Sequence, residues 1–148
     1  MIEFNEEGFL IPVRVHKMSL NHFYKTFIIK MEKREFRQRR WCELLDFIAF
    51  IKKHGIEDTF HMVIGGSLVR NHKDPGDIDI IMIFTLVDYQ ILSSIGVFDY
   101  LSKNSQEVFN IQIVCFMTVG DYKRIMQNNT TVSSIFNNSI KGTVRIKI

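Results

Sequence analysis

Two apolar runs separated by a polar turn mark the middle of the chain. The first covers residues 62–64 and ends at Gly65, and the second covers residues 80–84 without a polar interruption. A short apolar run that ends in glycine predicts a strand followed by a turn, whereas an unbroken run predicts a strand covered on both faces. Between them, residues 74–77 (Asp-Pro-Gly-Asp) form a strong turn signal. The pattern predicts a strand, a glycine turn, a short helix, a tight turn and a second strand.

Apolar residues at helical spacing predict three helices outside this stretch. Ser19 is the expected N-cap of the first, and the second runs from about residue 34 to 54 and stops at Gly55. The third is expected over residues 89–101, in spite of Gly96. The apolar stripe of the second helix consists of Trp41, Leu44, Leu45, Ile48 and Ile51. Such a stripe predicts that this helix covers one face of a sheet.

Further strands complete the expected fold. They are predicted at residues 107–117 and 142–148, with a short edge strand or extended arm at residues 9–15. Together these elements predict an α+β fold (an α/β mixed sheet), in which helices pack against a small mixed β-sheet. The 148 residues, 46% of them hydrophobic, predict a single globular domain over residues 1–148.

Composition narrows the range of functions. The net charge of +3 permits a polyanionic partner without requiring one. The acidic opening residues and the lack of a long apolar window predict a cytoplasmic protein with no signal peptide and no membrane partner. Cys42 and Cys115 are expected to be reduced core residues. The histidines show no metal-ligand spacing, and only His72 is placed to touch a phosphate, although a plain loop residue is the preferred interpretation.

The glycine turn is the first candidate for chemistry. Gly65 and Gly66 lack side chains, so the backbone can adopt a positive φ and a phosphate can approach it closely. With Ser67 as N-cap of the short helix, unpaired N–H groups would face the same phosphate. Alternatively, Gly-Gly-Ser is an ordinary turn, which is the commoner meaning of that tripeptide on its own.

Two aspartates open the second central strand. Asp77 and Asp79 share one side of an extended segment, with about 6.6 Å between successive same-side positions. Carboxylates that close repel each other unless a cation lies between them, and Mg²⁺ prefers such oxygen ligands with substrate phosphates completing its shell. Taken separately, Asp77 fits a turn residue and Asp79 a helix cap or a lysine partner. Beside the glycine turn, the pair predicts a site for a metal-bound nucleotide.

The succession of an apolar strand, Gly-Ser, nine intervening residues and Asp-Ile-Asp resembles the signature of the DNA polymerase β-like nucleotidyltransferase superfamily. Segments 8–12 and 141–146 look like those of short stand-alone phage and bacterial nucleotidyltransferase-like proteins of undescribed activity. The resemblance implies the nucleotidyltransferase fold, with Mg²⁺ as cofactor and a nucleoside triphosphate (NTP) as substrate or ligand. It also implies that Gly66 and Ser67 hold phosphates and that Asp77 and Asp79 hold the metal.

The resemblance further implies a third catalytic carboxylate on a neighbouring strand, which corresponds here to residues 109–113. Asn110 and Gln112 face the same way in that strand, and neither is an acid. One of them is expected at the third position, with Asn110 as the candidate catalytic residue, while Glu107 is an acid able to swing in from the start of the strand. An amide oxygen can ligate Mg²⁺ but cannot accept a proton, so two-metal chemistry would be impaired.

Two functions from different classes follow. The first is an Mg²⁺-dependent nucleotidyltransferase that moves a nucleoside monophosphate from an NTP to a protein or RNA hydroxyl. The second is a catalytically impaired nucleotide-binding or partner-binding module, for example a toxin–antitoxin or phage–host defence component. Because so short a chain leaves little room for an acceptor-binding domain, a homo-oligomer or a partner protein such as a toxin is a further candidate to complete the site.

A basic segment offers a third hypothesis. Its members are Arg34, Arg37, Arg39 and Arg40. They could steer a triphosphate or a nucleic acid toward the site. However, helical spacing spreads them around the helix, so a solvated face with local ion pairs is the preferred interpretation.

Overall fold

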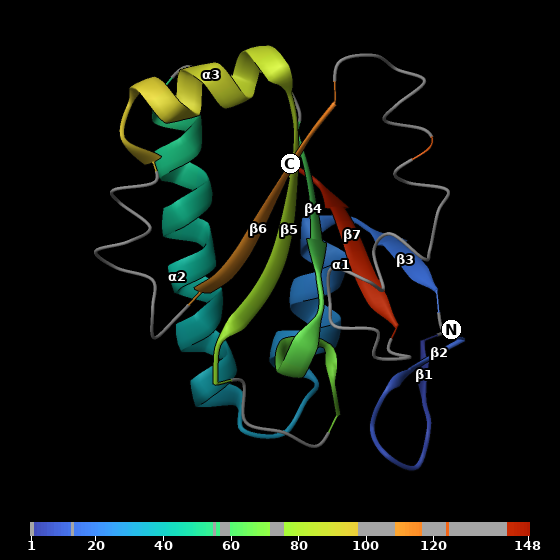
Figure 1. Cartoon of the computed structure of the whole chain (residues 1–148). Coiled ribbons are helices and arrows are strands. Elements are labelled where there is room, and N and C mark those ends of the chain that lie inside the picture. The colour runs from blue at the N-terminus through green and yellow to red at the C-terminus, as the bar shows by residue number, and fades with distance from the viewer. Residues whose placement is uncertain are drawn as a thin grey trace.

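The computed structural model describes residues 2–12, 14–54, 56, 60–71, 76–97, 124 and 142–148, together with the backbone of residues 109–116. Its centre is a five-stranded mixed sheet in the order β3-β7-β4-β5-β6 (Figure 1). The strands are β3 (Val15–Met18), β4 (His61–Ile64), β5 (Ile78–Thr85), β6 (Phe109–Phe116) and β7 (Thr143–Lys147). Strand β4 is antiparallel to both of its neighbours, β5 and β7. The two outer pairs, β5 with β6 and β3 with β7, are parallel.

A small hairpin lies outside this sheet. Strands β1 (Glu3–Phe4) and β2 (Leu10–Ile11) pair antiparallel. Residues 9–15, expected to form one edge strand or arm, are thus divided between the hairpin and β3. Gly142 lies tightly against the hairpin, because a Cβ at this position would come within 2.5 Å of Leu10 Cβ. The hairpin is therefore fixed to the start of β7.

Helices cover one side of the sheet (Figure 1). Helix α1 (Leu20–Phe23) continues as one π-helical turn, η1 (Tyr24–Ile29), and is followed by α2 (Arg34–Lys53). The predicted cap of α1 is confirmed, since Ser19 Oγ accepts a hydrogen bond from the His22 backbone N–H at 3.1 Å. Helix α2 has nearly its predicted bounds. Between β4 and β5 lies a single 3₁₀ turn, η2 (Gly66–Val69).

The core lies between these helices and the sheet. Alternate residues of the strands face it because side chains of a strand point to opposite faces in turn. The buried core residues on the strands include Met62, Ile64, Ile80, Met82, Phe84, Val144 and Ile146. Those on the helices include Phe23, Phe27, Trp41, Leu44, Phe47 and Ile51. Phe23 joins the two helices, with its ring centroid 4.9 Å from that of Phe27 and 6.0 Å from that of Trp41.

Two expectations about these elements are wrong. Helix α3 (Leu86–Ser94) begins at the Thr85 cap and ends before Gly96, instead of running through it. Gly96 has a φ of +73°, a left-handed conformation that ends a helix. Cys42 is exposed on α2 and not in the core, whereas the side chain of Cys115 lies outside the description. The part of the third helix that was expected beyond residue 97 lies outside the described residues.

The lengths of the helices bear on the expectation that the chain does not span a membrane. Among the described residues, no helix is both long enough and apolar enough to span a bilayer.

Candidate functional site

The side chain of Asp79 lies directly against the glycine turn. Asp79 is half-buried near the start of β5, between the buried residues Ile78 and Ile80. The Gly65 backbone N–H donates a hydrogen bond of 3.0 Å to the Asp79 carbonyl oxygen. Gly66 has a φ of +65°, and a Cβ at this position would overlap the Asp79 carboxylate oxygen Oδ2. The site therefore requires glycine at position 66 both for its backbone conformation and for the space that the carboxylate fills.

Ser67 does not cap a helix, which corrects the sequence-based expectation. It lies inside the one-turn η2 helix, where Gly65 is the N-cap residue and no side chain caps the turn. Its Oγ is buried and has no hydrogen-bond partner among the described residues. Buried hydroxyls are nearly always paired in folded proteins, so this hydroxyl is a donor that remains available beside the Asp79 carboxylate as far as the described residues go.

The η2 turn is held in place from α2 by a buried arginine. Arg37 is only 1% exposed. Its guanidinium donates to the Leu68 and Arg70 carbonyl oxygens, both at 2.6 Å. It also donates to the carbonyl oxygens of Phe27 at 3.0 Å and Glu32 at 3.2 Å. One side chain thus fixes the end of the glycine turn to η1 and to the segment before α2.

The sequence interpretation of the basic segment, a solvated face with local ion pairs, was wrong for Arg37 and right for Arg39. Arg39 is 75% exposed and pairs with Glu43 at 3.4 Å, whereas Arg40 pairs with Glu43 at 2.7 Å but is only 17% exposed. Arg37, in contrast, continues the buried stripe of α2, since it precedes Trp41 by four residues. That spacing was the available signal, because positions i and i+4 of a helix lie on the same face.

The N-terminal hairpin supports the turn from the other side. The guanidinium of Arg70 lies 3.7 Å from the ring centroid of Phe9 and donates to the Glu7 carbonyl oxygen at 3.1 Å. The Asn71 backbone N–H donates to the Gly8 carbonyl oxygen at 2.9 Å. The residues that follow the glycine turn are thereby attached to the hairpin through both backbone and side chain.

The other predicted site residues with a described position lie either just before β5 or on the neighbouring strand β6. Asp77 is exposed and directly precedes β5. Asn110 is the register partner of Asp79, whereas Gln112 is that of Ile81, two residues farther along the strand pair. Of the two amide residues, Asn110 therefore occupies the position beside Asp79. Glu107 and His72 lie outside the described residues.

The carboxylates suit a metal that arrives with its substrate. Among the described residues, no three side chains of the His, Cys, Asp and Glu types gather into a self-sufficient metal site. Mg²⁺ does not need one, because it is commonly bound by one or two carboxylates with substrate phosphates and water filling the remaining positions. Asp79 lies against the glycine turn and Asp77 directly precedes the same strand, so these are the described carboxylates that would hold such a metal.

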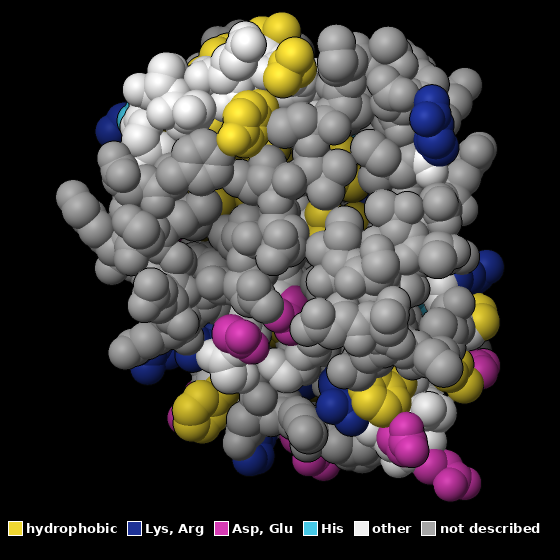
Figure 2. Space-filling view, viewed as in Figure 1, with side chains coloured by type: hydrophobic (Ala, Val, Ile, Leu, Met, Phe, Trp, Pro, Cys, Tyr) yellow, Lys and Arg dark blue, Asp and Glu magenta, His cyan; other side chains and the backbone are white. Residues whose placement is uncertain are grey.

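Charge on the surface near the site is mixed. Described acidic and basic side chains intermingle along the lower rim of the view in Figure 2, so neither sign dominates there.

The pKa of one histidine on β4, His61, is shifted. Burial, followed by the charges of Arg145 and Lys147, lowers the pKa of His61 below its ordinary value of 6.5.

Comparison with known proteins places the chain in a family but not in a functional class. The model of a family of unknown function, DUF6932, matches residues 2–147. The match covers nearly the whole chain, so the protein belongs to this family. No curated protein and no solved structure matches the chain.

Proposed function

We propose that the protein binds an NTP with Mg²⁺ at the glycine turn and transfers its nucleoside monophosphate to a hydroxyl group. The observation that carries this proposal is the fit between Gly66 and the Asp79 carboxylate, with the buried Ser67 Oγ beside them. The strand arrangement around the turn supports the resemblance to the DNA polymerase β-like nucleotidyltransferases. The motif lies on antiparallel β4 and β5, and β6 runs parallel to β5.

Each residue has a role in this reaction. The backbone of Gly65 and Gly66 and the Ser67 hydroxyl receive the terminal phosphates, and Asp77 and Asp79 hold the metal. When bound, Mg²⁺ neutralises phosphate charge and helps to align the leaving group. The acceptor oxygen forms a bond to the α phosphorus, the bond from that phosphorus to the bridging oxygen breaks, and pyrophosphate leaves. The hydroxyl proton passes to solvent, because Asn110 cannot accept it.

A second candidate is favoured by Asn110 alone. In register with Asp79, this residue occupies the position where a third carboxylate would assist proton removal. A site with an amide there is suited to nucleotide binding without turnover, as in a nucleotide sensor or a protein-partner module. The two candidates share the binding step and differ in whether a product forms.

Calorimetric titration tests the shared step. ATP, GTP, CTP and UTP are titrated with and without Mg²⁺ into the unchanged protein, Asp79→Asn and Asp46→Asn, the last of which alters an exposed aspartate of α2. We expect Mg²⁺-dependent binding that Asp79→Asn abolishes and Asp46→Asn preserves. Equal binding by all three proteins, or no binding of any nucleotide, would refute the proposed site.

Incorporation of α-labelled NTP into RNA or protein acceptors then separates the two candidates. Label transferred by the unchanged protein supports the transferase. Binding without transfer supports the second candidate, and transfer gained in Asn110→Asp would identify the missing carboxylate as the cause.

A further inference from the structure

A cavity of about 460 Å³, here called the β3 pocket, lies along the edge strand β3, at the opposite end of the sheet from β6. Four basic or imidazole side chains line it, and none of the described lining residues is acidic. They are Arg14, His16, Lys17 and His22. The side chains of Arg14, Lys17 and His22 form no ion pair or hydrogen bond with any other described residue. A cavity with this lining favours an anion.

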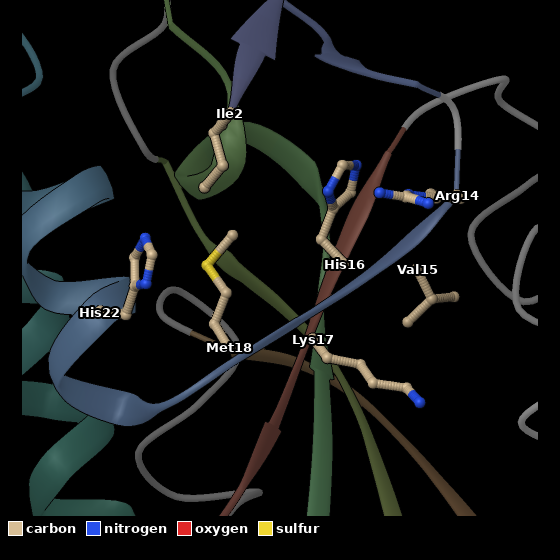
Figure 3. A pocket seen from close by; sticks show the side chains of 7 residues that line it. All are labelled: Ile2, Arg14, Val15, His16, Lys17, Met18 and His22. Atoms are coloured by element: carbon tan, nitrogen blue, oxygen red, sulfur yellow. The ribbon is translucent and has the colours of Figure 1, made fainter.

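The basic groups lie at two ends of an apolar middle. In Figure 3, Met18 and Ile2 lie between His22 on α1 and the neighbouring side chains of His16 and Arg14. His16 is held in one orientation, since it is only 8% exposed and its Nε2 donates to the Pro12 carbonyl oxygen at 2.9 Å. The pocket thus combines a fixed imidazole and a guanidinium at one end with an apolar floor.

This combination matches the parts of a nucleotide. Arginine binds phosphate through its planar fork of donors, while imidazole rings and apolar side chains receive the face of a base. The volume lies within the range of pockets that hold small organic ligands. A free inorganic anion would use the charged end and leave the apolar middle exposed to water.

The strand register connects the pocket to the candidate nucleotide site. Val15 pairs with Thr143, and Thr143 lies opposite Gly65, which is bonded to Asp79. Three strand spacings therefore separate Val15 from Asp79, which corresponds to about 14 Å. Lys17 points to the face of the sheet that also carries Asp79, because cross-strand partners share a face. His16 and Met18 point to the opposite face, so a strand held in the pocket reaches Asp79 by passing around the edge strand β3. A chain of a few nucleotides can span this distance.

We propose that the β3 pocket binds one nucleotide unit of a single-stranded nucleic acid, with its phosphate at Arg14 and its base against Ile2 and Met18. The strand then passes around the edge of the sheet at Lys17 toward Asp79. Binding of the strand requires neither Mg²⁺ nor the glycine turn. The role of the bound strand as the hydroxyl acceptor rests on the proposed nucleotidyl transfer.

Fluorescence anisotropy of a labelled single-stranded RNA of about 12 nucleotides tests the proposal. The titration is made in EDTA, so that the Mg²⁺-dependent site does not contribute. We expect the double variant Arg14→Gln/His22→Gln to bind about tenfold more weakly, with a salt dependence reduced by about one phosphate contact. Both side chains are exposed, so the variant is expected to fold, which circular dichroism checks.

Three comparisons make the result decisive. Arg34→Gln removes an exposed arginine outside the pocket and is expected to bind RNA normally, so an equal loss in that variant would overturn the assignment to the pocket. AMP is expected to compete far less well than the oligonucleotide, and equal competition would replace the strand with a free nucleotide. Asp79→Asn is expected to keep RNA binding in EDTA whether or not nucleotidyl transfer occurs, which separates failure of this proposal from failure of the proposed function.

Discussion

Two positions in one transverse row of the sheet, Asp79 on β5 toward one end and Val15 on β3 at the other, are built in different ways. At one end, Asp79 lies against Gly66 in a turn whose carbonyls are tied down by the buried Arg37. At the other end, Val15 belongs to an edge strand whose neighbouring basic side chains are mostly exposed. The first end has a fixed shape with little freedom for substitution, whereas the second depends on charge and tolerates changes of side chain.

This difference indicates how the two ends contribute to binding. Preorganised groups lose little entropy when a ligand binds, so the glycine turn is suited to hold reacting phosphates. Exposed cations attract a strand from solution and contribute contacts that weaken with salt. Substitutions at the turn are therefore expected to affect folding and binding together, and those at β3 to affect binding alone.

The largest effect is expected from Arg37→Met. The substitution leaves up to four carbonyl oxygens without their donor, two of them in the turn. We expect the free energy of unfolding to fall by about 4 kcal/mol. Urea denaturation measures the loss, and Arg39→Met, which alters an exposed arginine of the same helix, should cost less than about 1 kcal/mol. Equal losses in the two variants would show that Arg37 does not fix the turn.

A somewhat smaller loss is expected from Gly66→Ala. The left-handed φ and the overlap with Asp79 together should lower the free energy of unfolding by about 3 kcal/mol. In Gly66→Ala/Asp79→Ala the overlap is relieved, so a double-mutant cycle should give a coupling energy of about 1–2 kcal/mol. Gly76→Ala is the matched control, because a Cβ there meets nothing within 4 Å. If the stability losses of Gly66→Ala and Asp79→Ala simply added in the double variant, the contact between these two residues would be contradicted.

The sequence predicted strands β4, β5, β6 and β7 and the position of the glycine turn, because these features have local signals, whereas β1 was not predicted and residues 9–15 did not form one strand. The unbroken run of residues 80–84 became part of β5, and all five of its residues are buried, so the strand is covered on both faces there. Ser19 and the stripe of α2 were equally readable. Asp79 was marked as a site residue, but its contact with Gly66 depends on the pairing of β4 with β5, which no local pattern specifies.

Other features depended on long-range packing and were missed. Arg37 was taken for a surface residue because charge usually indicates exposure, yet its partners lie up to 33 positions away in the chain. The β3 pocket draws residues from the N-terminal segment, β3 and α1, so their spacing carries no common period. Helical spacing was followed through Gly96, where the left-handed conformation of the glycine ended the helix.

A more modest change is expected from Ser67→Ala, which should increase the stability of the protein and weaken its binding of NTP. Removing a buried hydroxyl that has no partner among the described residues should raise the free energy of unfolding by about 1 kcal/mol, or the melting temperature by about 2–4 °C. If this hydroxyl receives a phosphate, NTP affinity should fall by about tenfold. Ser19→Ala, which removes the cap of α1, should instead destabilise by about 1 kcal/mol. Loss of stability in both variants would remove Ser67 from the proposed site.

The smallest effect is expected in the pH dependence of stability that His61 on β4 contributes. Burial and two nearby cations lower the pKa of His61 in the folded protein, so near pH 6.5 the unfolded chain binds this proton more readily. The contribution of His61 to stability is therefore complete above its ordinary pKa of 6.5 and is lost as pH falls toward the lower folded value.

Urea denaturation at about pH 7.5 and about pH 5.5 measures this contribution, because the two values bracket the ordinary pKa of histidine. The loss of stability on acidification should be smaller in His61→Asn than in the unchanged protein. His54→Asn, at the end of α2, is the matched control and should retain the full dependence on His61. An unchanged acid loss in His61→Asn would show that burial within the sheet does not control the protonation of this residue. The rigid environment inferred for the glycine turn would then not include His61 at the other end of β4.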